Sequence, residues 1–344
     1  MNNNAAWLTG IQQIEIGCAE MPMQQDDELL IRVDYCGICG SDMHFFETGC
    51  YSKGPIPFPH IPGHECSGHV VAVGKSTEGF SVGDRVAVEP GIPCGVCPEC
   101  KSGHYNLCKS VHFKSVPPYN GVLRNYIAHN YKRCFKLPDS ISNVQGALIE
   151  PFAIGLHAAR HAGIKKGDVV VILGAGCIGM MTLLACRALG AESAIVADLA
   201  DFRLEKAKKM GAAYVINSGL EDASARVLEI TGGHGADVVF ETAGSPVTLA
   251  MTPNMCKSAG VIMMVGNIFK PVALDVWTIA HREIDLRGIY RYCNDYPAAI
   301  ELIAGGKVDF SEMITNVYDF KDVQNAFMQS ISDKEHTLKG VIKL

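Results

Sequence analysis

The sequence predicts an α/β protein with two parts, a β-rich first part and a doubly wound parallel sheet. Three observations support this prediction. The chain has 344 residues, enough for two domains of ordinary size. Short β-branched runs separated by Gly and Pro fill residues 1 to about 150, and strand-like and helix-like runs alternate from about residue 166 onward. A glycine-rich turn follows the first strand-like run of this second part.

Strand-like runs in the first part lie at residues 28–33, 69–73 and 85–88. Residues 55–62 hold four prolines in eight positions, so this segment is predicted to be a loop.

Six strand-like runs in the second part alternate with helix-like runs, which favours a parallel sheet with helical crossovers. The strand-like runs are residues 169–173, 194–197, 213–216, 238–240, 261–265 and 284–288. The helix-like runs include residues 178–189, 202–210 and 247–257, and the tail has helical stretches near 297–304 and 321–330.

Composition and charge exclude several classes of protein. Hydrophobic residues make up 48% and charged residues 19%, a globular composition that excludes disorder and collagen. The net charge is −6 and no basic run is present, so nucleic acid is not an expected partner. The apolar run 169–186 is β-branched at first and then broken by glycines, which favours a buried strand and helix over a membrane span.

The N-terminus and the cysteines predict where the protein resides. The first ten residues, MNNNAAWLTG, have no cationic start and no apolar core, so no signal peptide is expected there. The 14 cysteines are then predicted to be free thiols or metal ligands in a reducing, cytoplasmic setting.

The glycine-rich turn has the pattern G-x-G-x-x-G, formed by Gly174, Gly176 and Gly179 between a strand and a helix. Gly174 permits the tight turn, Gly176 lets a pyrophosphate approach the backbone, and Gly179 lets helix and strand pack closely. The free N–H groups at the start of the helix favour phosphate binding. The next strand-like run ends at Asp198, where an acid can bind the ribose hydroxyls and repel a 2′-phosphate. NAD is therefore the predicted cofactor, although Arg203 lies nearby.

Four cysteines form the strongest single signal in the chain. Cys94, Cys97, Cys100 and Cys108 lie within fifteen residues on a Gly- and Pro-containing loop. Four thiolates at this spacing are typical of a closed, structural zinc site. An iron–sulfur cluster and a zinc-ribbon nucleic-acid reader are weaker alternatives, the second because the loop carries only two lysines.

A second, scattered set of possible metal ligands consists of Cys39, His64, Glu65 and Glu150. Each alone is a weak signal, because a single buried Cys or His is usually a packed core residue. Together they offer sulfur, nitrogen and carboxylate oxygen, a mixed set suited to a catalytic zinc with an open position. Spacing alone does not establish that these residues converge.

The motifs, taken together, resemble the zinc-dependent medium-chain alcohol dehydrogenase family. The similar segments are CGICGSDMH (36–44), PGHECSGHVVAVG (62–74), VGDRV (82–86), the four-cysteine loop, the Glu-Pro pair at 150–151 and VVVILGAGCIGMM (169–181). They occur in the family's order over nearly the whole chain. The segments VEPG (88–91), GHYNLC (103–108), ALIEP (147–151) and RYCN (291–294) look most like the sorbitol and xylitol dehydrogenase branch.

The resemblance implies a fold and a set of residue roles. It implies a GroES-like β-barrel catalytic domain with a zinc-binding lobe (1–155), a Rossmann NAD-binding domain (156–290) and a C-terminal return to the catalytic domain (291–344). It implies that Cys39, His64 and Glu65 hold the catalytic zinc, and that Glu150 binds it directly or through water. Ser41 and His44 match the proton-relay positions. The positions matching NAD contacts are Ile178, Asp198, Arg203, Val265, Gly266 and Asn267.

The predicted activity is oxidation of a polyol such as sorbitol or xylitol to a ketose, with hydride transfer to NAD, as in L-iditol 2-dehydrogenase. Arg291 and Tyr292 match substrate-side positions, and Phe45 stands where animal sorbitol dehydrogenases carry a tyrosine. L-Threonine and vicinal diols are alternative substrates within the family, and a non-enzymatic zinc- and NAD-binding protein is the alternative outside it. We expect two zinc ions per chain, a small-molecule partner, no nucleic acid or membrane partner, and a homotetramer.

Overall fold

The computed structural model describes residues 2–51 and 53–344, and the chain divides into two compact units. Unit 1 comprises residues 1–150, 296–304 and 314–344, and unit 2 comprises 151–295 and 305–313. The C-terminal return expected for 291–344 is thus interrupted, because residues 291–295 and 305–313 group with unit 2. Among the described residues, no helix is long and apolar enough to cross a membrane.

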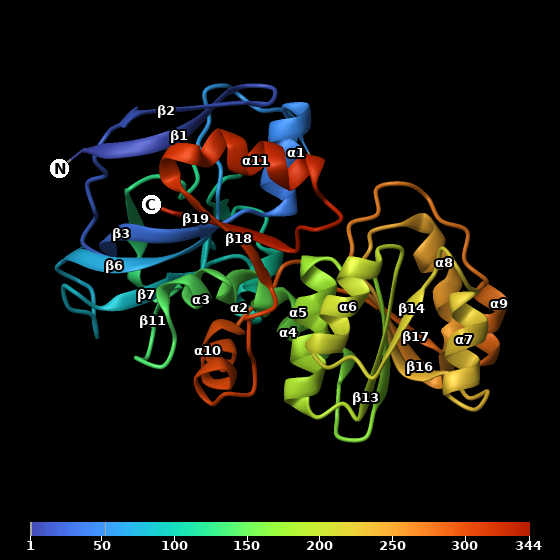
Figure 1. Cartoon of the computed structure of the whole chain (residues 1–344). Coiled ribbons are helices and arrows are strands. Elements are labelled where there is room, and N and C mark those ends of the chain that lie inside the picture. The colour runs from blue at the N-terminus through green and yellow to red at the C-terminus, as the bar shows by residue number, and fades with distance from the viewer. Residues whose placement is uncertain (1, 52) are drawn as a thin grey trace. The chain divides into compact units, whose positions relative to one another are not determined.

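Unit 1 is built on a mixed seven-stranded sheet in which sequence-distant strands are neighbours (Figure 1). Its strands, in sheet order, are β11 (Cys134–Lys136), β7 (Arg85–Val88), β6 (Glu65–Val73), β3 (Glu28–Gly37), β19 (Lys339–Lys343) and β18 (Ile314–Asp319), with β10 (Tyr126–Asn130) also pairing β3. Three two-stranded pairs complete the strands of this unit: β1 (Asn3–Gly10) with β2 (Gln13–Ala19), β4 (Cys50–Tyr51) with β5 (Gly54–Pro55), and β8 (Gly91–Ile92) with β9 (His112–Phe113).

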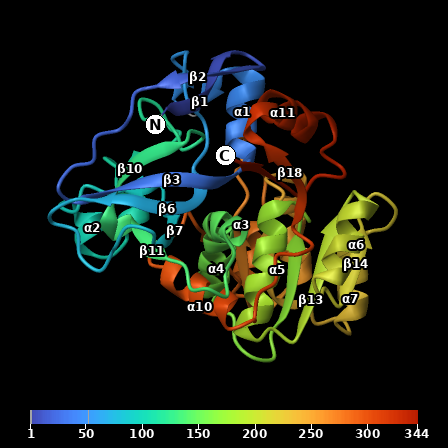
Figure 2. The same cartoon turned by 60° about the vertical axis from the view of Figure 1, so that its left-hand side comes forward.

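The helices of unit 1 are short. They are α1 (Gly40–Thr48), α2 (Pro98–Lys101), α3 (Asn143–Ala147), α10 (Tyr296–Ala304) and α11 (Val323–Ser332), with 3-10 turns at Tyr105–Leu107, Tyr131–Arg133 and Phe320–Asp322. Helices α1 and α11 lie side by side in both views, although about 280 residues separate them in sequence (Figure 2). Phe46 of α1 meets Phe327 of α11 with ring centroids 5.4 Å apart, so the C-terminal segment shares the core of this unit.

Unit 2 contains the predicted parallel sheet. Its strands, in sheet order, are β14 (Tyr214–Asn217), β13 (Ser193–Asp198), β12 (Val169–Leu173), β15 (Ala236–Glu241), β16 (Cys256–Met264) and β17 (Asp285–Gly288). The order reverses between β12 and β15, and this switch point is where open α/β sheets bind ligands. The β-branched residues of β12 are almost all buried, as expected for a central parallel strand.

Helices flank this sheet and connect its strands. They are α5 (Cys177–Leu189), α6 (Asp201–Lys209), α7 (Ala223–Ile230), α8 (Pro246–Met255) and α9 (Val276–His281), and α4 (Ile149–Ala162) begins at the boundary between the units. The helix expected over 247–257 ends at Met255, because Cys256 takes an extended backbone and begins β16. Gly190, with φ +100°, ends α5 in the left-handed conformation that glycine adopts without strain.

Candidate active site and metal centres

The mixed ligand set is assembled by two neighbouring strands of unit 1. Cys39 follows β3 and is the N-cap residue of α1, whereas His64 and Glu65 stand at the start of β6. Glu65 lies directly opposite Gly37 in the antiparallel pairing of these strands. The possible ligand atoms of Cys39, His64 and Glu65 all lie within 4.8 Å of one another, so residues that are far apart in sequence converge as predicted.

Asp42 orients His64 in a way that sequence reasoning missed. Its carboxylate is 1% exposed and accepts hydrogen bonds from the Gly63 N–H at 3.1 Å and from the Ser115 hydroxyl at 2.5 Å. His64 Nδ1 lies 3.0 Å from Asp42 Oδ2. With Nδ1 directed to the carboxylate, Nε2 is the nitrogen left for a metal, as in carboxylate–histidine–zinc triads.

The pKa values of this pair reflect their mutual attraction. Burial alone raises the pKa of Asp42, but the charge of His64 and the hydrogen bonds from His64, Ser115 and Gly63 lower it overall. Burial alone lowers the pKa of His64, but Asp42 and Cys39 raise it well above its usual value. A metal ion binding at His64 therefore displaces a proton from the metal-free site.

The donor set suits a divalent transition metal. One sulfur, one imidazole nitrogen and one carboxylate oxygen are three protein ligands of the kind found around catalytic zinc, with a position left for water or substrate. All three side chains are at least partly buried. A zinc ion held there by Cys39, His64 and Glu65 would supply Lewis-acid polarisation of an oxygen bound at the open position.

The other residues predicted for this site also belong to unit 1. Ser41 is exposed and donates to Cys39 Sγ at 3.4 Å, and His44 is exposed three residues further along α1. Glu150 is 4% exposed at the start of α4 but is not part of the ligand group, so its ligation stays a prediction. Phe45 is 7% exposed and packs in the hydrophobic core, and its place beside a substrate likewise stays a prediction.

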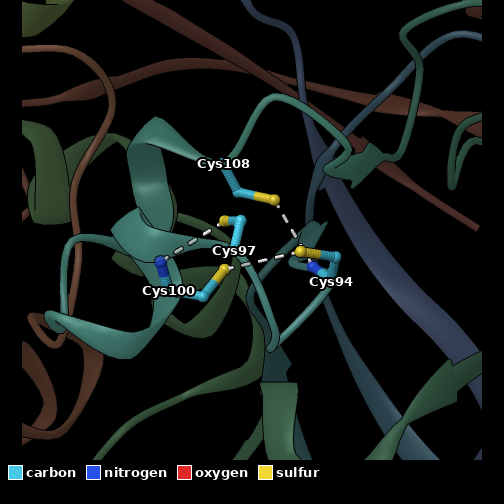
Figure 3. A group of neighbouring side chains, drawn as sticks. All are labelled: Cys94, Cys97, Cys100 and Cys108. Carbon is cyan, nitrogen blue, oxygen red and sulfur yellow. Dashed lines mark hydrogen bonds between the residues drawn. The ribbon is translucent and has the colours of Figure 1, made fainter.

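The four predicted structural ligands form a second centre. Cys94, Cys97, Cys100 and Cys108 point toward one another, and their sulfur atoms lie within 4.8 Å (Figure 3). Backbone N–H groups also face sulfur, with Cys94 N donating to Cys108 Sγ at 3.4 Å and Cys100 N to Cys97 Sγ at 3.5 Å. Hydrogen bonds from the Val96 and Cys97 N–H groups lower the pKa of the Cys94 thiol to about 6. The site is closed, with four cysteine ligands, as in structural zinc sites.

The glycine turn in unit 2 has the geometry that its motif predicts. Gly174 has φ +102° at the end of β12, which only glycine adopts readily. A Cβ on Gly176 would meet nothing within 4 Å, so the backbone is open to a close ligand. A Cβ on Gly179 would collide with the Gly174 carbonyl oxygen, so Gly179 permits the tight packing of helix on strand. Ile178 lies in the first turn of α5.

Asp198 is the last residue of β13, and its carboxylate joins the glycine turn to the loop that follows β13. Its Oδ2 accepts from the Ala175 N–H at 2.6 Å, and its Oδ1 accepts from the Leu199 and Ala200 N–H groups at 2.8 and 2.9 Å. A carboxylate can accept about four hydrogen bonds, which leaves room for a ribose hydroxyl on Oδ2. Arg203 is half-buried on α6.

The other predicted cofactor and substrate residues also lie in unit 2. Val265, Gly266 and Asn267 follow β16, and the Val265 and Gly266 N–H groups both donate to the Glu241 carbonyl at 2.9 Å. Tyr292 is 3% exposed, whereas the Arg291 guanidinium lies 4.9 Å from the centroid of the Tyr290 ring. Arg291 has φ +55°, an unusual conformation for a residue with a side chain.

Known protein families and individual proteins are similar to this chain. The family described as alcohol dehydrogenase GroES-like domain matches residues 25–139, and the family described as zinc-binding dehydrogenase matches residues 177–305. The chain is 41% identical to the sorbitol dehydrogenase of Bacillus subtilis, covering 99% of this chain and 97% of that protein. It is 45% identical to an uncharacterized zinc-type alcohol dehydrogenase-like protein, YdjJ, of Escherichia coli, covering 100% and 99% of the two.

A solved structure extends the likeness to three dimensions. An oxidoreductase/dehydrogenase of unknown specificity, involved in membrane biogenesis, from Escherichia coli superposes with a TM-score of 0.96 at 45% identity, over 100% of this chain and 99% of that chain. The protein therefore belongs to the zinc-dependent medium-chain alcohol dehydrogenase family. Within it, the chain is a zinc-dependent NAD(P) dehydrogenase of the polyol or diol type, with a GroES-like part and a Rossmann part.

Proposed function

We propose that the protein oxidises a polyol such as sorbitol or xylitol to a ketose and transfers the hydride to NAD. The observation that carries this proposal is the convergence of Cys39, His64 and Glu65 into one mixed ligand set. The 41% identity to a sorbitol dehydrogenase supports a polyol as the substrate. Oxidation of L-threonine or of a vicinal diol is the alternative within the family.

Each residue of the site has a distinct task in this proposal. Cys39, His64 and Glu65 hold the metal, and Glu150 supports it directly or through a water molecule. Ser41 and His44 are three residues apart on α1, a spacing that places them on one face of the helix. We propose that they pass the proton of the substrate hydroxyl to solvent, which both exposed side chains reach.

Hydride transfer is the chemistry of the bound nicotinamide cofactor. The cofactor's pyrophosphate is proposed to lie against Gly176 and the start of α5, where the backbone is open and N–H groups are free of helical partners. Asp198 favours NAD over NADP, because its carboxylate accepts ribose hydroxyls and repels a 2′-phosphate. Ile178, Arg203 and residues 265–267 are proposed to complete the cofactor site.

Substrate selection is proposed to depend on polar groups beyond the metal. Arg291 and Tyr292 can bond hydroxyls on the carbons next to the reacting one, and Phe45 is proposed to limit the pocket. A site built to bond hydroxyls rejects analogues that lack them, because its own buried polar groups then stay unpaired.

A panel of substrates followed by NADH absorbance at 340 nm tests the function. We expect sorbitol and xylitol to have far higher kcat/KM values than 2-propanol, and NAD to exceed NADP. Higher kcat/KM for L-threonine or for 2,3-butanediol would select the alternative. The Arg291→Ala variant should lose much more kcat/KM with the polyol than with 2-propanol, and equal losses would place Arg291 outside substrate binding.

We also propose a homotetrameric assembly in a cytoplasmic setting. Strand β17 ends the parallel sheet and has one neighbour, β16, among the described strands. Antiparallel pairing of β17 with a second copy about Leu286 would place Asp285 opposite Arg287, and opposite charges stabilise such pairs. Trp277, on the helix before this strand, is 75% exposed. None of the 14 cysteines, all of which the structure describes, forms a disulfide, which agrees with a reducing compartment. Light scattering measures the assembly, and a monomer would contradict it.

A further inference from the structure

A fully buried lysine faces the mixed ligand set. Lys339 is the first residue of β19 and is 2% exposed. Its Nζ donates to Glu65 Oε1 at 2.8 Å and to the Ile38 carbonyl at 3.0 Å, and it lies 2.6 Å from Glu65 Oε2. Removing a charged ammonium from water costs free energy, so a buried lysine needs a partner of opposite charge. Glu65 is that partner.

Glu65 is therefore held from two sides. Lys339 faces both carboxylate oxygens, and Gly37 packs against Oε2 so closely that a Cβ at position 37 would collide with it. Among the described residues Oε2 has the ion pair with Lys339 but no partner in hydrogen-bond geometry, so it keeps lone pairs to offer a metal. The same carboxylate thus belongs to a buried ion pair and to the ligand group with Cys39 and His64.

Lys339 offsets one of the negative charges gathered at the ligand set. The Cys39 thiolate, Glu65 and Asp42 contribute three negative charges, and His64 as a metal ligand is neutral. With Lys339 counted, these groups sum to two negative charges. Without Lys339 the cation would face one further uncompensated negative charge, and Glu65 would direct all of its charge to the metal.

We propose that Lys339 is a positioning residue that shares Glu65 with the catalytic metal. The ammonium fixes the carboxylate when the site holds no metal, and it weakens the bond from Glu65 to the metal when the site is filled. This inference rests on the proposed metal site at Cys39, His64 and Glu65. The ion pair with Lys339 makes Glu65 a weaker and more exchangeable ligand than the four thiolates of the other centre.

The test measures how fast cobalt leaves the full-length protein. Both centres are loaded with Co²⁺, and the absorption band of the mixed site is assigned by its loss in Cys39→Ser. Excess chelator is then added and the decay of that band is followed. We expect Lys339→Met to lose cobalt about tenfold more slowly than the wild type, equivalent to about 1.4 kcal/mol. The band should also change in position or intensity, because the carboxylate binds the metal more strongly.

Two variants separate charge from packing. Lys339→Arg keeps the positive charge and should restore the wild-type rate. Lys343→Met removes an exposed lysine from the same strand and should leave the rate unchanged. Metal should also raise the thermal midpoint more in Lys339→Met than in the wild type, because Glu65 lacks its countercharge in the metal-free variant.

Each alternative result is decisive. A rate in Lys339→Met that equals or exceeds the wild-type rate would show that Lys339 only joins β19 to the sheet, and the inference would be wrong. If Lys339→Met unfolds without metal, folding upon addition of Co²⁺ supports the inference and failure to fold at saturating Co²⁺ overturns it. A wild type that binds metal only at the four cysteines would overturn the proposed metal site itself, a result distinct from an unchanged rate in the variant.

Discussion

Replacing Asp42 with Asn should weaken metal binding at the mixed site while leaving the fold intact. The amide keeps an oxygen that can accept from the Gly63 N–H and from the Ser115 hydroxyl. It loses the negative charge that faces His64 Nδ1 at 3.0 Å. Without that charge, the tautomer with the proton on Nδ1 is less favoured. The tautomer with the proton on Nε2 has no lone pair on the nitrogen that the metal needs.

Two estimates of the magnitude agree. A hydrogen bond to a charged group contributes about 1.5–3 kcal/mol. Loss of such an outer-shell partner typically costs about 10–100-fold in metal affinity, or about 1.4–2.7 kcal/mol. We therefore expect the dissociation constant for zinc at the mixed site to rise by about 10–100-fold.

The assay is competition for zinc with a chromophoric chelator, at several pH values. Because Asp42 raises the pKa of His64, the wild-type affinity should increase with pH until His64 is deprotonated in the metal-free protein. Asp42→Asn lowers that pKa, so its affinity should level off at a lower pH. Circular dichroism confirms that the variant is folded.

The chain offers a matched control. Asp34 lies 2.5 Å from His69 Nδ1 in the same sheet, but neither residue belongs to either group of possible metal ligands. Asp34→Asn should leave zinc affinity unchanged. An Asp42→Asn affinity within about twofold of the wild type would refute the reasoning, because a twofold change is under 0.5 kcal/mol.

Three further predictions concern other parts of the molecule. The Cys97→Ser variant should bind one zinc ion where the wild type binds two, measured by elemental analysis, and its midpoint of thermal unfolding should be lower. Retention of both ions would contradict a structural role. Asp198→Ala should raise KM for NAD and narrow the preference over NADP, and a wild type that is faster with NADP would contradict the assignment. Burial, Lys114 and Arg133 lower the pKa of His129 to about 3 despite a hydrogen bond to the Glu89 carbonyl. The unfolded chain binds a proton at His129 below about pH 6.5, whereas the folded chain binds it only near pH 3. The free energy of unfolding, measured by urea titration, should therefore fall as the pH is lowered from about 6.5 toward 3, and this fall should be smaller in His129→Gln. An equal fall in the two proteins would be evidence against this.

The parallel sheet was predictable because each strand is a short, nearly continuous apolar run between helical segments. Residues 169–173 and 85–88 were predicted with the bounds that the structure has. The helix predicted over 247–257 was too long, because an apolar run does not show where a buried helix ends and a buried strand begins. The C-terminal strands were not predicted, since their pairing with β3 depends on contacts distant in sequence.

The site was predictable only in part. The four-cysteine centre is local, and its spacing was sufficient to find it. The convergence of Cys39 with His64 and Glu65 needed the family resemblance, because periodicity does not place separate loops together. Asp42 was missed although it stands inside a quoted motif, since an aspartate on a short helix is usually exposed. Lys339 is 274 residues from Glu65, and no local signal marks it.

The place of β19 in the sheet has a consequence for how the protein is made. This strand lies between β3 and β18, so the sheet of unit 1 stays incomplete until residues 339–343 have been synthesised. Glu65 is synthesised 274 residues before its countercharge, Lys339. A chain truncated before residue 339 would carry every proposed metal ligand and still lack the partner that compensates the buried charge of Glu65. Such truncated chains should fold poorly and be degraded, so β19 links the burial of Glu65 to the completion of the sheet of unit 1.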